Sequence, residues 1–464
     1  MSTEPTRPKE GESEEPSGLT EASPALDAEL DTARALIQAD QPAATEPLPD
    51  QRREYRAFWL LLGAGWLGTN LGYYLAELPI QFVLKEELHL SADVLAGSMA
   101  MAHFTNYIKP LAGVLTDGIP FFGTRRRHYL LLGLTVCGIL WFALGFVPRT
   151  YRTFLFTYAF MYIFVVLIST VLGGVMAEGG ARFNATGRLS AQRISIFRIA
   201  MVAGGVLGGI LAKMQFLVTT SIVAGLHLLL VPLFYFRLRE KPAPPREHSA
   251  AEAVRDQFAR ILKARTLWVA AGLVCLVVAA PGFNTPLLYY QRDTLGFDKD
   301  FIGLLKSIGA LFGFIAAGLY GLVCRRVNLR KLLAWSIVVH ATGTLVYLAY
   351  RTPATALSIT ALEGLCQTLA LMPLYDLAIR ATPRGSEAMG YSVMMSVWNL
   401  TNAAADYLGS WLFSKYGITF RQLIWLNSGT TALVLFAVPF LPAALMDRRE
   451  GEPVDQSRTD LAGA

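Results

Sequence analysis

The sequence predicts an all-α integral membrane protein in which twelve transmembrane helices form two pseudo-symmetric six-helix bundles. Of its 464 residues, 53% are hydrophobic and 16% are charged, whereas an ordinary soluble domain carries about 25% charged residues. Apolar runs of the roughly 20 residues that a spanning helix needs recur from Ala57 to Met446. A polar, basic segment divides these runs into six and six, which indicates a duplicated architecture.

The two ends of the chain are predicted to be cytoplasmic tails. Residues 1–55 are rich in Glu, Pro, Ser and Ala and hold few large apolar side chains, so they are expected to be disordered. The start is acidic and polar rather than basic and apolar, so the first span is expected to act as the insertion signal. Residues 447–464 form the second tail. Lys and Arg gather in alternate loops, which places both tails inside.

The first bundle is expected within residues 56–238. Its spans are predicted at residues 57–83, 92–116, 129–147, 153–177, 194–212 and 218–236. The run Arg125–Arg127 marks the loop after the second span as cytoplasmic. The fifth span repeats Gly204-Gly205 and Gly208-Gly209 at the small-xxx-small spacing that allows close helix packing.

Residues 239–266 form a basic cytoplasmic linker with a predicted amphipathic helix. Ala253, Val254, Phe258, Ile261 and Leu262 lie on one face of that helix, and charged residues lie on the other. This pattern is typical of a helix that lies at the membrane interface.

The second bundle is expected within residues 267–446. Its spans are predicted at residues 267–290, 301–323, 331–350, 354–379, 387–413 and 422–446. Pro281, Gly282 and Pro286 should interrupt the seventh span and free backbone carbonyls near a binding site. The basic segment Cys324–Lys331 follows the eighth span, as Arg125–Arg127 follows the second.

Polar residues near mid-membrane depth predict a substrate cavity. The candidates are Asn70, Asn106, Lys109, Asn284, Gln367, Trp398, Asn399 and Asn402. Hydrogen bonds between packed helices are an equally open interpretation of the asparagines. Tyr73 and Trp398 offer aromatic faces, and Lys109 or Arg198 offers a counter-charge for an anionic substrate.

Carboxylates inside spans are rare and are functional candidates by default. The candidates for proton coupling are Glu77, Glu363, Asp376 and Asp406. Two alternatives stay open: Glu77 could extend to the outer interface, and Asp376 could pair with Arg380 four residues further on.

Three stretches carry a family resemblance. They are NYIKPLAGVLTDGIPFFGTRRRHY from Asn106, PGFNTPLLYYQRDTLGFDKDFIG from Pro281, and MPLYDLAIRATPRGSEAMGYSVMMSVWNL from Met372 with the later Gly409. In order and spacing the chain resembles the folate–biopterin transporter family of the major facilitator superfamily. One departure is Gly173, where that family typically has an aspartate about five residues before the glutamate that closes the fourth span. If that carboxylate takes part in proton or pteridine binding, its role here is lost or moved, and Asp376 and Asp406 are possible replacements.

The resemblance implies a secondary active transporter, a symporter that works by alternating access and is coupled to protons. Its implied substrate is a small organic solute such as a folate- or pteridine-like anion. By analogy with the superfamily, the predicted cytoplasmic gate comprises Gly113, Asp117, Arg125, Arg126, Arg127, Glu178 and Arg182. Within it, the Gly113-xxx-Asp117 pattern should let backbones approach closely.

Other function classes find little support in the sequence. The four cysteines are isolated and lack metal-ligand spacing, and no nucleophile–base set or phosphate loop occurs, so neither enzyme activity nor a cofactor is expected. The net charge of +6 lies mostly in loops, where it orients the spans, so nucleic acid is not expected as a partner. A monomer in the lipid bilayer is expected, in the inner membrane if the source is bacterial. The alternative is a non-transporting scaffold or pigment-delivery protein on the same fold.

Overall fold

The computed structural model describes residues 49–118, 121–183, 185–240, 250–323, 327, 329–380 and 387–436. The chain divides into two compact units, Met1–Arg56 and Ala57–Ala464. Of the first unit the structure describes residues 49–56, which begin helix α2. The rest of α2 and the other helices belong to the second unit.

Before the linker, the described chain forms nine helical elements joined by short connections. They are α2 (Pro49–Phe82), η1 (Val83–Glu87), α3 (Ala92–Ala102), η2 (Phe104–Asn106), α4 (Lys109–Gly118), α5 (Arg127–Leu144), α6 (Tyr151–Arg182), α7 (Thr186–Leu211) and α8 (Phe216–Arg237). Helix α6 continues to Arg182, past the predicted end of the fourth span at residue 177, so Glu178 lies on the helix. The loop between α6 and α7 is correspondingly short.

The linker contains the predicted amphipathic helix, α9 (Ala250–Lys263). Ile261 is buried in a core cluster, whereas Phe258 and Leu262 are exposed. The following elements are α10 (Arg265–Val278), α11 (Asn284–Tyr289), η3 (Tyr290–Thr294), α12 (Lys299–Val323), α13 (Leu329–Leu345), η4 (Val346–Ala349), α14 (Pro353–Arg380), α15 (Glu387–Lys415) and α16 (Phe420–Leu433).

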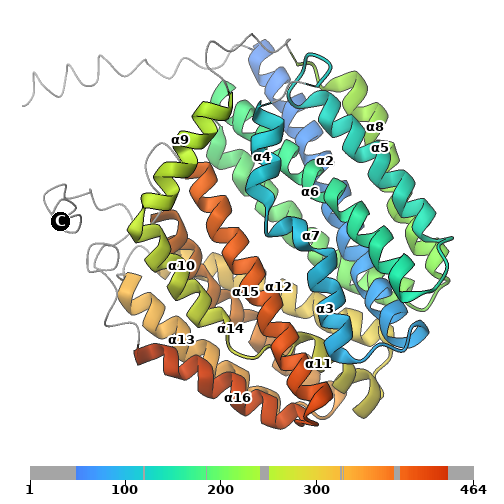
Figure 1. Cartoon of the computed structure of the whole chain (residues 1–464), viewed down its shortest axis with the longest axis vertical. Coiled ribbons are helices and arrows are strands. Elements are labelled where there is room, and N and C mark those ends of the chain that lie inside the picture. The colour runs from blue at the N-terminus through green and yellow to red at the C-terminus, as the bar shows by residue number, and fades with distance from the viewer. Residues whose placement is uncertain are drawn as a thin grey trace, which may run out of the picture. The chain divides into compact units, whose positions relative to one another are not determined.

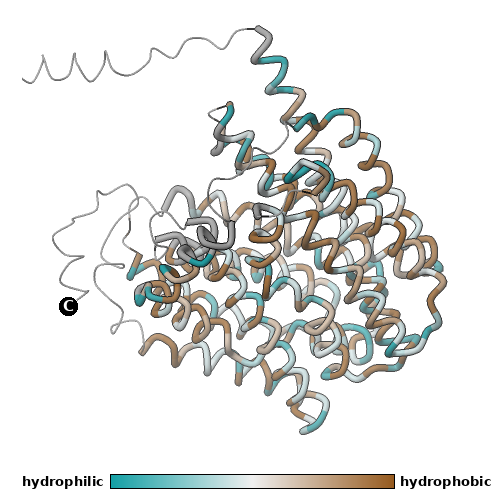
Figure 2. Tube along the Cα trace, turned by 45° about the horizontal axis from the view of Figure 1, so that its top comes forward, coloured by the Kyte–Doolittle hydropathy of each residue, from teal (hydrophilic) through white to brown (hydrophobic). Residues whose placement is uncertain are grey.

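The helices of the second unit carry the surface that lipid requires. Among the described residues, 7 helices are long and apolar enough to cross a membrane. Phe156, Leu229 and Trp335 are large apolar side chains that remain exposed, and hydrophobic residues run along the helices while many hydrophilic ones lie at their ends (Figure 2). Outward apolar side chains are stable in hydrocarbon, where backbone groups must be paired within helices.

Two of the predicted spans are interrupted. The break in the seventh span is confirmed, because α10 ends at Val278 and α11 begins at Asn284. The prediction of a continuous second span is wrong: α3 ends at Ala102, η2 follows, and α4 begins at Lys109. Pro110 suits the first turn of a helix, where its missing N–H is not needed, so α4 can begin at Lys109.

The last predicted span is described only in part. Helix α16 ends at Leu433, and residues 437–446 of the prediction lie outside the described residues. Thr419 caps the start of α16, since its hydroxyl accepts from the Gln422 N–H while the Gln422 side chain accepts from the Thr419 N–H.

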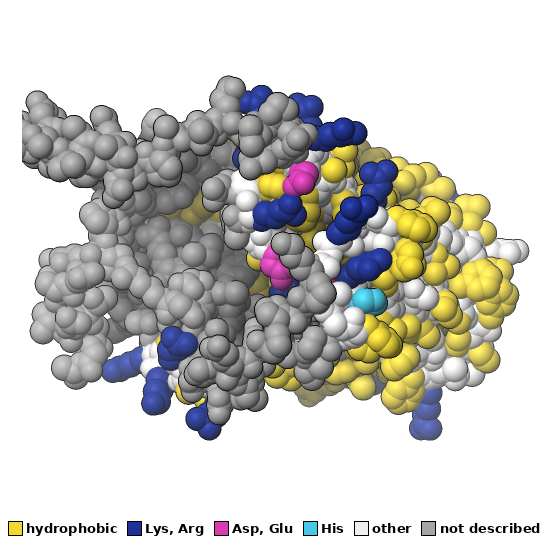
Figure 3. Space-filling view, turned by 90° about the horizontal axis from the view of Figure 1, so that it is seen from above, with side chains coloured by type: hydrophobic (Ala, Val, Ile, Leu, Met, Phe, Trp, Pro, Cys, Tyr) yellow, Lys and Arg dark blue, Asp and Glu magenta, His cyan; other side chains and the backbone are white. Residues whose placement is uncertain are grey.

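Within the second unit, helices before and after the linker meet along two lines. Helix α7 packs on α12, and α3 packs on α15 (Figure 1). The end of the helices near Arg237 and Arg265 is called the linker face, and the end near Glu87 and Thr294 is called the opposite face. Lys and Arg side chains gather on the linker face (Figure 3).

The glycine pattern of α7 explains its close contact with α12. A Cβ on Gly209 would lie 2.8 Å from the Lys299 carbonyl oxygen and 3.0 Å from the Gly303 Cα. A Cβ on Gly205 would lie 2.8 Å from the Gly303 carbonyl oxygen. Ser307 donates its hydroxyl to the Val202 carbonyl at 2.6 Å. The predicted small-xxx-small packing is confirmed, and this contact is called the α7–α12 seam.

Candidate functional site

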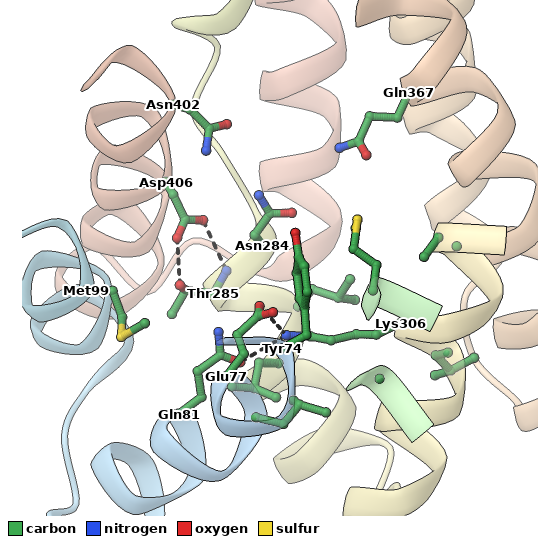
Figure 4. A pocket seen from close by; sticks show the side chains of 18 of the residues that line it. Tyr74, Glu77, Gln81, Met99, Asn284, Thr285, Lys306, Gln367, Asn402 and Asp406 are labelled. Atoms are coloured by element: carbon green, nitrogen blue, oxygen red, sulfur yellow. Dashed lines mark hydrogen bonds and ion pairs between the residues drawn. The ribbon is translucent and has the colours of Figure 1, made fainter. Parts of the chain in front are cut away.

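A cavity of about 530 Å³ lies among helices from both sides of the linker. Several of its polar side chains point into a common space (Figure 4). The predicted residues that line it are Asn106, Asn284, Gln367, Asn399, Asn402, Glu77, Glu363, Asp406, Arg198 and Tyr73. Elements α2, η2, α7, α11, α14 and α15 therefore bring polar groups that are distant in sequence to one site.

Other predicted cavity residues lie elsewhere. Asn70 donates to the Trp66 carbonyl of its own helix at 2.7 Å, and Trp398 packs against a hydrophobic core cluster. Neither side chain lines the cavity, nor does Lys109. The side chain of Asp376 lies outside the described residues, as does that of Arg380.

Asp406 holds the broken seventh span in place. Its Oδ1 accepts from the Thr285 backbone N–H at 3.1 Å, and its Oδ2 accepts from the Thr285 hydroxyl at 2.6 Å. The Gly282 N–H donates to the Ala405 carbonyl at 2.8 Å, and Asn427 donates to the Pro281 carbonyl at 2.9 Å. Helices α15 and α16 thus satisfy polar groups that the break leaves without helical partners.

An aromatic cluster adjoins the break in the second span. The His103 ring lies 4.2 Å from the Tyr162 ring, centroid to centroid, and His103 Nε2 lies 3.1 Å from the Tyr158 hydroxyl. Asn106 donates its amide to the Tyr162 hydroxyl at 3.0 Å. The cluster therefore positions His103 and Asn106, both of which line the cavity.

Lys306 is a charged cavity residue that the sequence reasoning missed. Its ammonium donates to Glu77 Oε1 at 2.8 Å and to Gln81 Oε1 at 3.2 Å (Figure 4). The sequence does contain a signal for this residue, because a lysine inside the apolar run of α12 is as unusual as the carboxylates inside other spans.

On the opposite face, an ion-pair lock joins helices before the linker to helices after it. The lock comprises Lys85, Glu86, Arg292, Asp293 and Lys299. Lys85 Nζ lies 2.5 Å from Asp293 Oδ1, and Glu86 accepts from Arg292 Nε at 2.8 Å and from Lys299 Nζ at 2.6 Å. Burial raises the pKa of Glu86, but hydrogen bonds from Lys299 and Arg292 outweigh burial and hold the pKa below its ordinary value.

The sequence of this cavity-bearing chain matches a known family. The sequence model of the BT1 family covers residues 71–461. The chain belongs to the BT1 family.

Relatives of this BT1-family chain are named as transporters. A folate-biopterin transporter of Synechocystis sp. is 26% identical over 391 residues, which is 79% of this chain and 78% of the relative. Folate transporter 1 of Plasmodium falciparum is 24% identical over 370 residues, which is 74% of this chain and 70% of the relative. The family resemblance found in the sequence is confirmed, and the chain is a membrane transporter and not an enzyme.

Solved structures show the fold of this BT1-family transporter. A D-xylose-proton symporter superposes with a TM-score of 0.64 at 15% identity, covering 83% of this chain and 98% of that one. The nucleoside transporter NupG gives a TM-score of 0.63 at 15% identity, with coverages of 83% and 98%. The prediction of an all-α membrane protein with the major facilitator fold is confirmed.

The basic loop of this BT1-family transporter contacts both the start of the linker and helix α6. Glu240 accepts from the backbone N–H of each of Arg125, Arg126 and Arg127, the Arg125 bond being 2.8 Å long. Arg126 Nε lies 2.9 Å from Glu178 Oε1. Within the predicted gate residues, Arg126 therefore pairs with Glu178.

Two glycines that the sequence singled out, Gly113 and Gly173, have open space beside them. A Cβ added to Gly113 would meet nothing within 4 Å, so the close backbone approach predicted there is wrong for this structure. Gly173 likewise has open space beside it and does not line the cavity. The side chain of Asp117 lies outside the described residues.

Proposed function

We propose that this transporter moves a small organic anion with a planar ring by alternating access, coupled to protons. One observation carries the proposal: the cavity is lined from both sides of the linker, and the ion-pair lock joins the same two sets of helices at the opposite face. A site between two sets of helices that are joined at one end is what alternating access requires.

The cavity lining supports a planar, anionic substrate. Tyr73, Tyr74, His103 and Tyr107 offer ring faces for stacking. Side-chain amides, such as those of Asn284 and Gln367 in Figure 4, offer both donors and acceptors to the edge of a heteroaromatic ring. Lys306 and Arg198 supply positive charge. Because relatives are named as folate and folate-biopterin transporters, we propose a folate- or pteridine-like anion as the substrate.

Proton coupling is assigned to the cavity carboxylates, and Glu363 is the leading candidate. Among the described residues, Glu363 has no hydrogen bond or ion pair, whereas Glu77 pairs with Lys306 and Asp406 accepts from Thr285. Glu363 can therefore gain or lose a proton without breaking an existing contact. A structural neighbour named as a proton symporter supports proton coupling, and the choice of Glu363 rests on its surroundings.

The linker face is assigned to the cytoplasm, and residues 56–238 and 267–446 are assigned to two six-helix bundles that rock as a monomer. Lys and Arg gather on the linker face, as the positive-inside rule requires of a cytoplasmic surface. The lock then lies on the outer side, and the conformation is closed to the outside.

Uptake by proteoliposomes tests the proposal. Labelled folate, biopterin and a panel of aromatic carboxylates are offered with and without a proton gradient. We expect uptake of at least one pteridine, stimulated by the gradient and lost in Ala403→Trp, which fills the cavity with an indole. Uptake equal to that of protein-free liposomes for every compound would overturn the proposed function.

A further inference from the structure

The Glu77–Lys306 ion pair is a contact between α2 and α12 inside the cavity. The Lys306 side chain is 35% exposed and that of Glu77 is 25% exposed, and both line the cavity. Solutes in the cavity can therefore reach both charges. An ammonium has three N–H donors. Among the described residues, Glu77 and Gln81 accept two of them, which leaves a third for a ligand.

Lys306 is placed next to the tightest part of the α7–α12 seam. The following residue, Ser307, donates to the Val202 carbonyl at 2.6 Å. Gly303, one helical turn before Ser307, lies against Gly205 and Gly209. A change in the partner of Lys306 therefore acts where helices before and after the linker are closest.

The Lys306 ammonium cannot hold the Glu77 carboxylate and a substrate carboxylate at the same time, because the two negative charges repel each other. A substrate carboxylate bound to the Lys306 ammonium stands beside the Glu77 carboxylate, and like charges at such a distance repel strongly when water is scarce. A ligand shifts a conformational equilibrium only through its differential affinity for the two states. An anion that binds Lys306 better when Glu77 has withdrawn thus favours separation of α2 from α12.

We propose that Lys306 is the anion-binding residue of the cavity and that Glu77 is the counter-ion which the substrate carboxylate displaces, so that anion binding weakens the contact between α2 and α12. This inference rests on the proposed function, because it names the group that would recognise the charge of the transported solute. It makes Lys306 and Glu77 determinants of specificity, with opposite effects on affinity.

Binding to the purified full-length chain, measured by calorimetry, tests the inference separately from transport. The probes are folate, which carries carboxylates, biopterin, which has the same ring system without them, and a panel of aromatic carboxylates each paired with its amide. Lys306→Gln should weaken folate binding by about tenfold or more, the loss expected for a charge-assisted hydrogen bond, and should leave biopterin binding unchanged. Lys306→Arg keeps the charge and should recover part of the affinity.

Glu77→Gln gives the sharper result. It removes the competing carboxylate, so folate should bind about threefold more tightly, the size expected of a partly exposed ion pair. A merely structural pair would lose affinity for every probe in both variants. Lys213→Gln is the control: it removes the 2.7 Å ion pair that joins the turn after α7 to Asp300 on α12, outside the cavity, and binding should stay as in the unchanged chain.

The outcomes separate the two proposals. Carboxylates that bind no better than their amides, or folate binding that is unaffected by Lys306→Gln, would overturn the role of Lys306 even if proteoliposomes take up a pteridine. Carboxylate binding that depends on Lys306, without uptake of any compound, would instead support the anion site and overturn the proposed transport function.

Discussion

Among the cavity carboxylates, Glu363 differs from Glu77 and Asp406 in its surroundings. In the described part of the chain it has no bonded partner, although it lines the cavity. We expect Glu363→Gln to abolish stimulation of uptake by a proton gradient, because an amide cannot carry the coupling proton. Exchange of substrate between the two sides of preloaded proteoliposomes needs no net proton movement and should continue.

Glu87→Gln serves as the control for this substitution. Glu87 pairs with Arg149 at 3.0 Å on the opposite face and does not line the cavity. Its substitution should leave the stimulation by the gradient intact. Stimulation that survives in Glu363→Gln would show that another group carries the proton, with Asp406→Asn as the next variant to measure.

Glu86 predicts how the lock responds to pH. Its pKa is lowered from 4.5, so its ion pairs contribute fully above that value and are lost only as pH falls through the lower pKa of the closed state. The lock should therefore be unaffected between about pH 5 and 8. Spin-label distances across the opposite face, measured in the Glu363→Gln background at pH 5.5 and 7.5, should coincide, and opening on acidification in this range would contradict the assignment.

Residue-scale prediction worked where polarity was unusual and failed where orientation mattered. Asn284, Asn402 and Asp406 stand out in apolar runs, and they line the cavity. Asn70 stands out in the same way but bonds within its own helix. A helix that is apolar on all sides gives no hydrophobic face from which the direction of one polar side chain can be read.

At the scale of elements, chain-breaking residues decided what the sequence could reveal. Pro281 and Gly282 predicted the break before α11. Helix α15 stabilises this break through Asp406. The break at His103 to Ile108 had no such signal, because Pro110 lies within the first turn of α4, a position that a helix tolerates. The sequence therefore revealed one of these two interruptions and missed the other.

The α7–α12 seam makes a prediction for Gly209. A Cβ there would lie 2.8 Å from the Lys299 carbonyl oxygen, and backbone cannot move away as a side chain can. Overpacking of this kind costs about 1–3 kcal/mol, and the cost applies only while the seam is closed. Gly209→Ala should therefore favour the separated state, seen as a longer component in the distance between spin labels at Met214→Cys and Asp298→Cys.

Gly225→Ala is the matched control for the seam. Gly225 lies on α8, where a new Cβ would meet nothing within 4 Å. The same substitution should leave the distance distribution unchanged. A distribution that stays unchanged in Gly209→Ala as well would show that the seam does not part at this position.

On the scale of the whole molecule, the sequence indicated the membrane class, the family and the position of the linker, but not the contacts that close the cavity. Composition and run lengths determine the membrane class, since lipid selects for apolar helices, and the three stretches from Asn106, Pro281 and Met372 determine the family. The lock joins Lys85 and Glu86 to residues more than 200 positions away, Arg292 and Asp293. One sequence offers no signal for such pairs, because each charge looks like an ordinary loop residue until the helices are placed.

The lock gives the prediction that bears most directly on alternating access. Partly exposed ion pairs contribute up to about 1 kcal/mol each, and Glu86→Gln with Asp293→Asn weakens the pairs with Arg292, Lys299 and Lys85 together. We expect the population open at the opposite face to rise by about tenfold, since about 1.4 kcal/mol corresponds to that factor. The measurement is the labelling rate of Asn284→Cys, a cavity position, by an impermeant thiol reagent added on that face, in a background without the native cysteines.

Glu87→Gln again provides the comparison, because the Glu87–Arg149 pair lies on the same face but joins residues that both precede the linker. A labelling rate that rises in the double variant and not in Glu87→Gln would mean that closure depends on charges which cross between the two sets of helices. Equal rates in both variants would mean that closure of this face depends on helix packing and not on the lock, and Gly209→Ala should then raise the rate where removal of the lock does not.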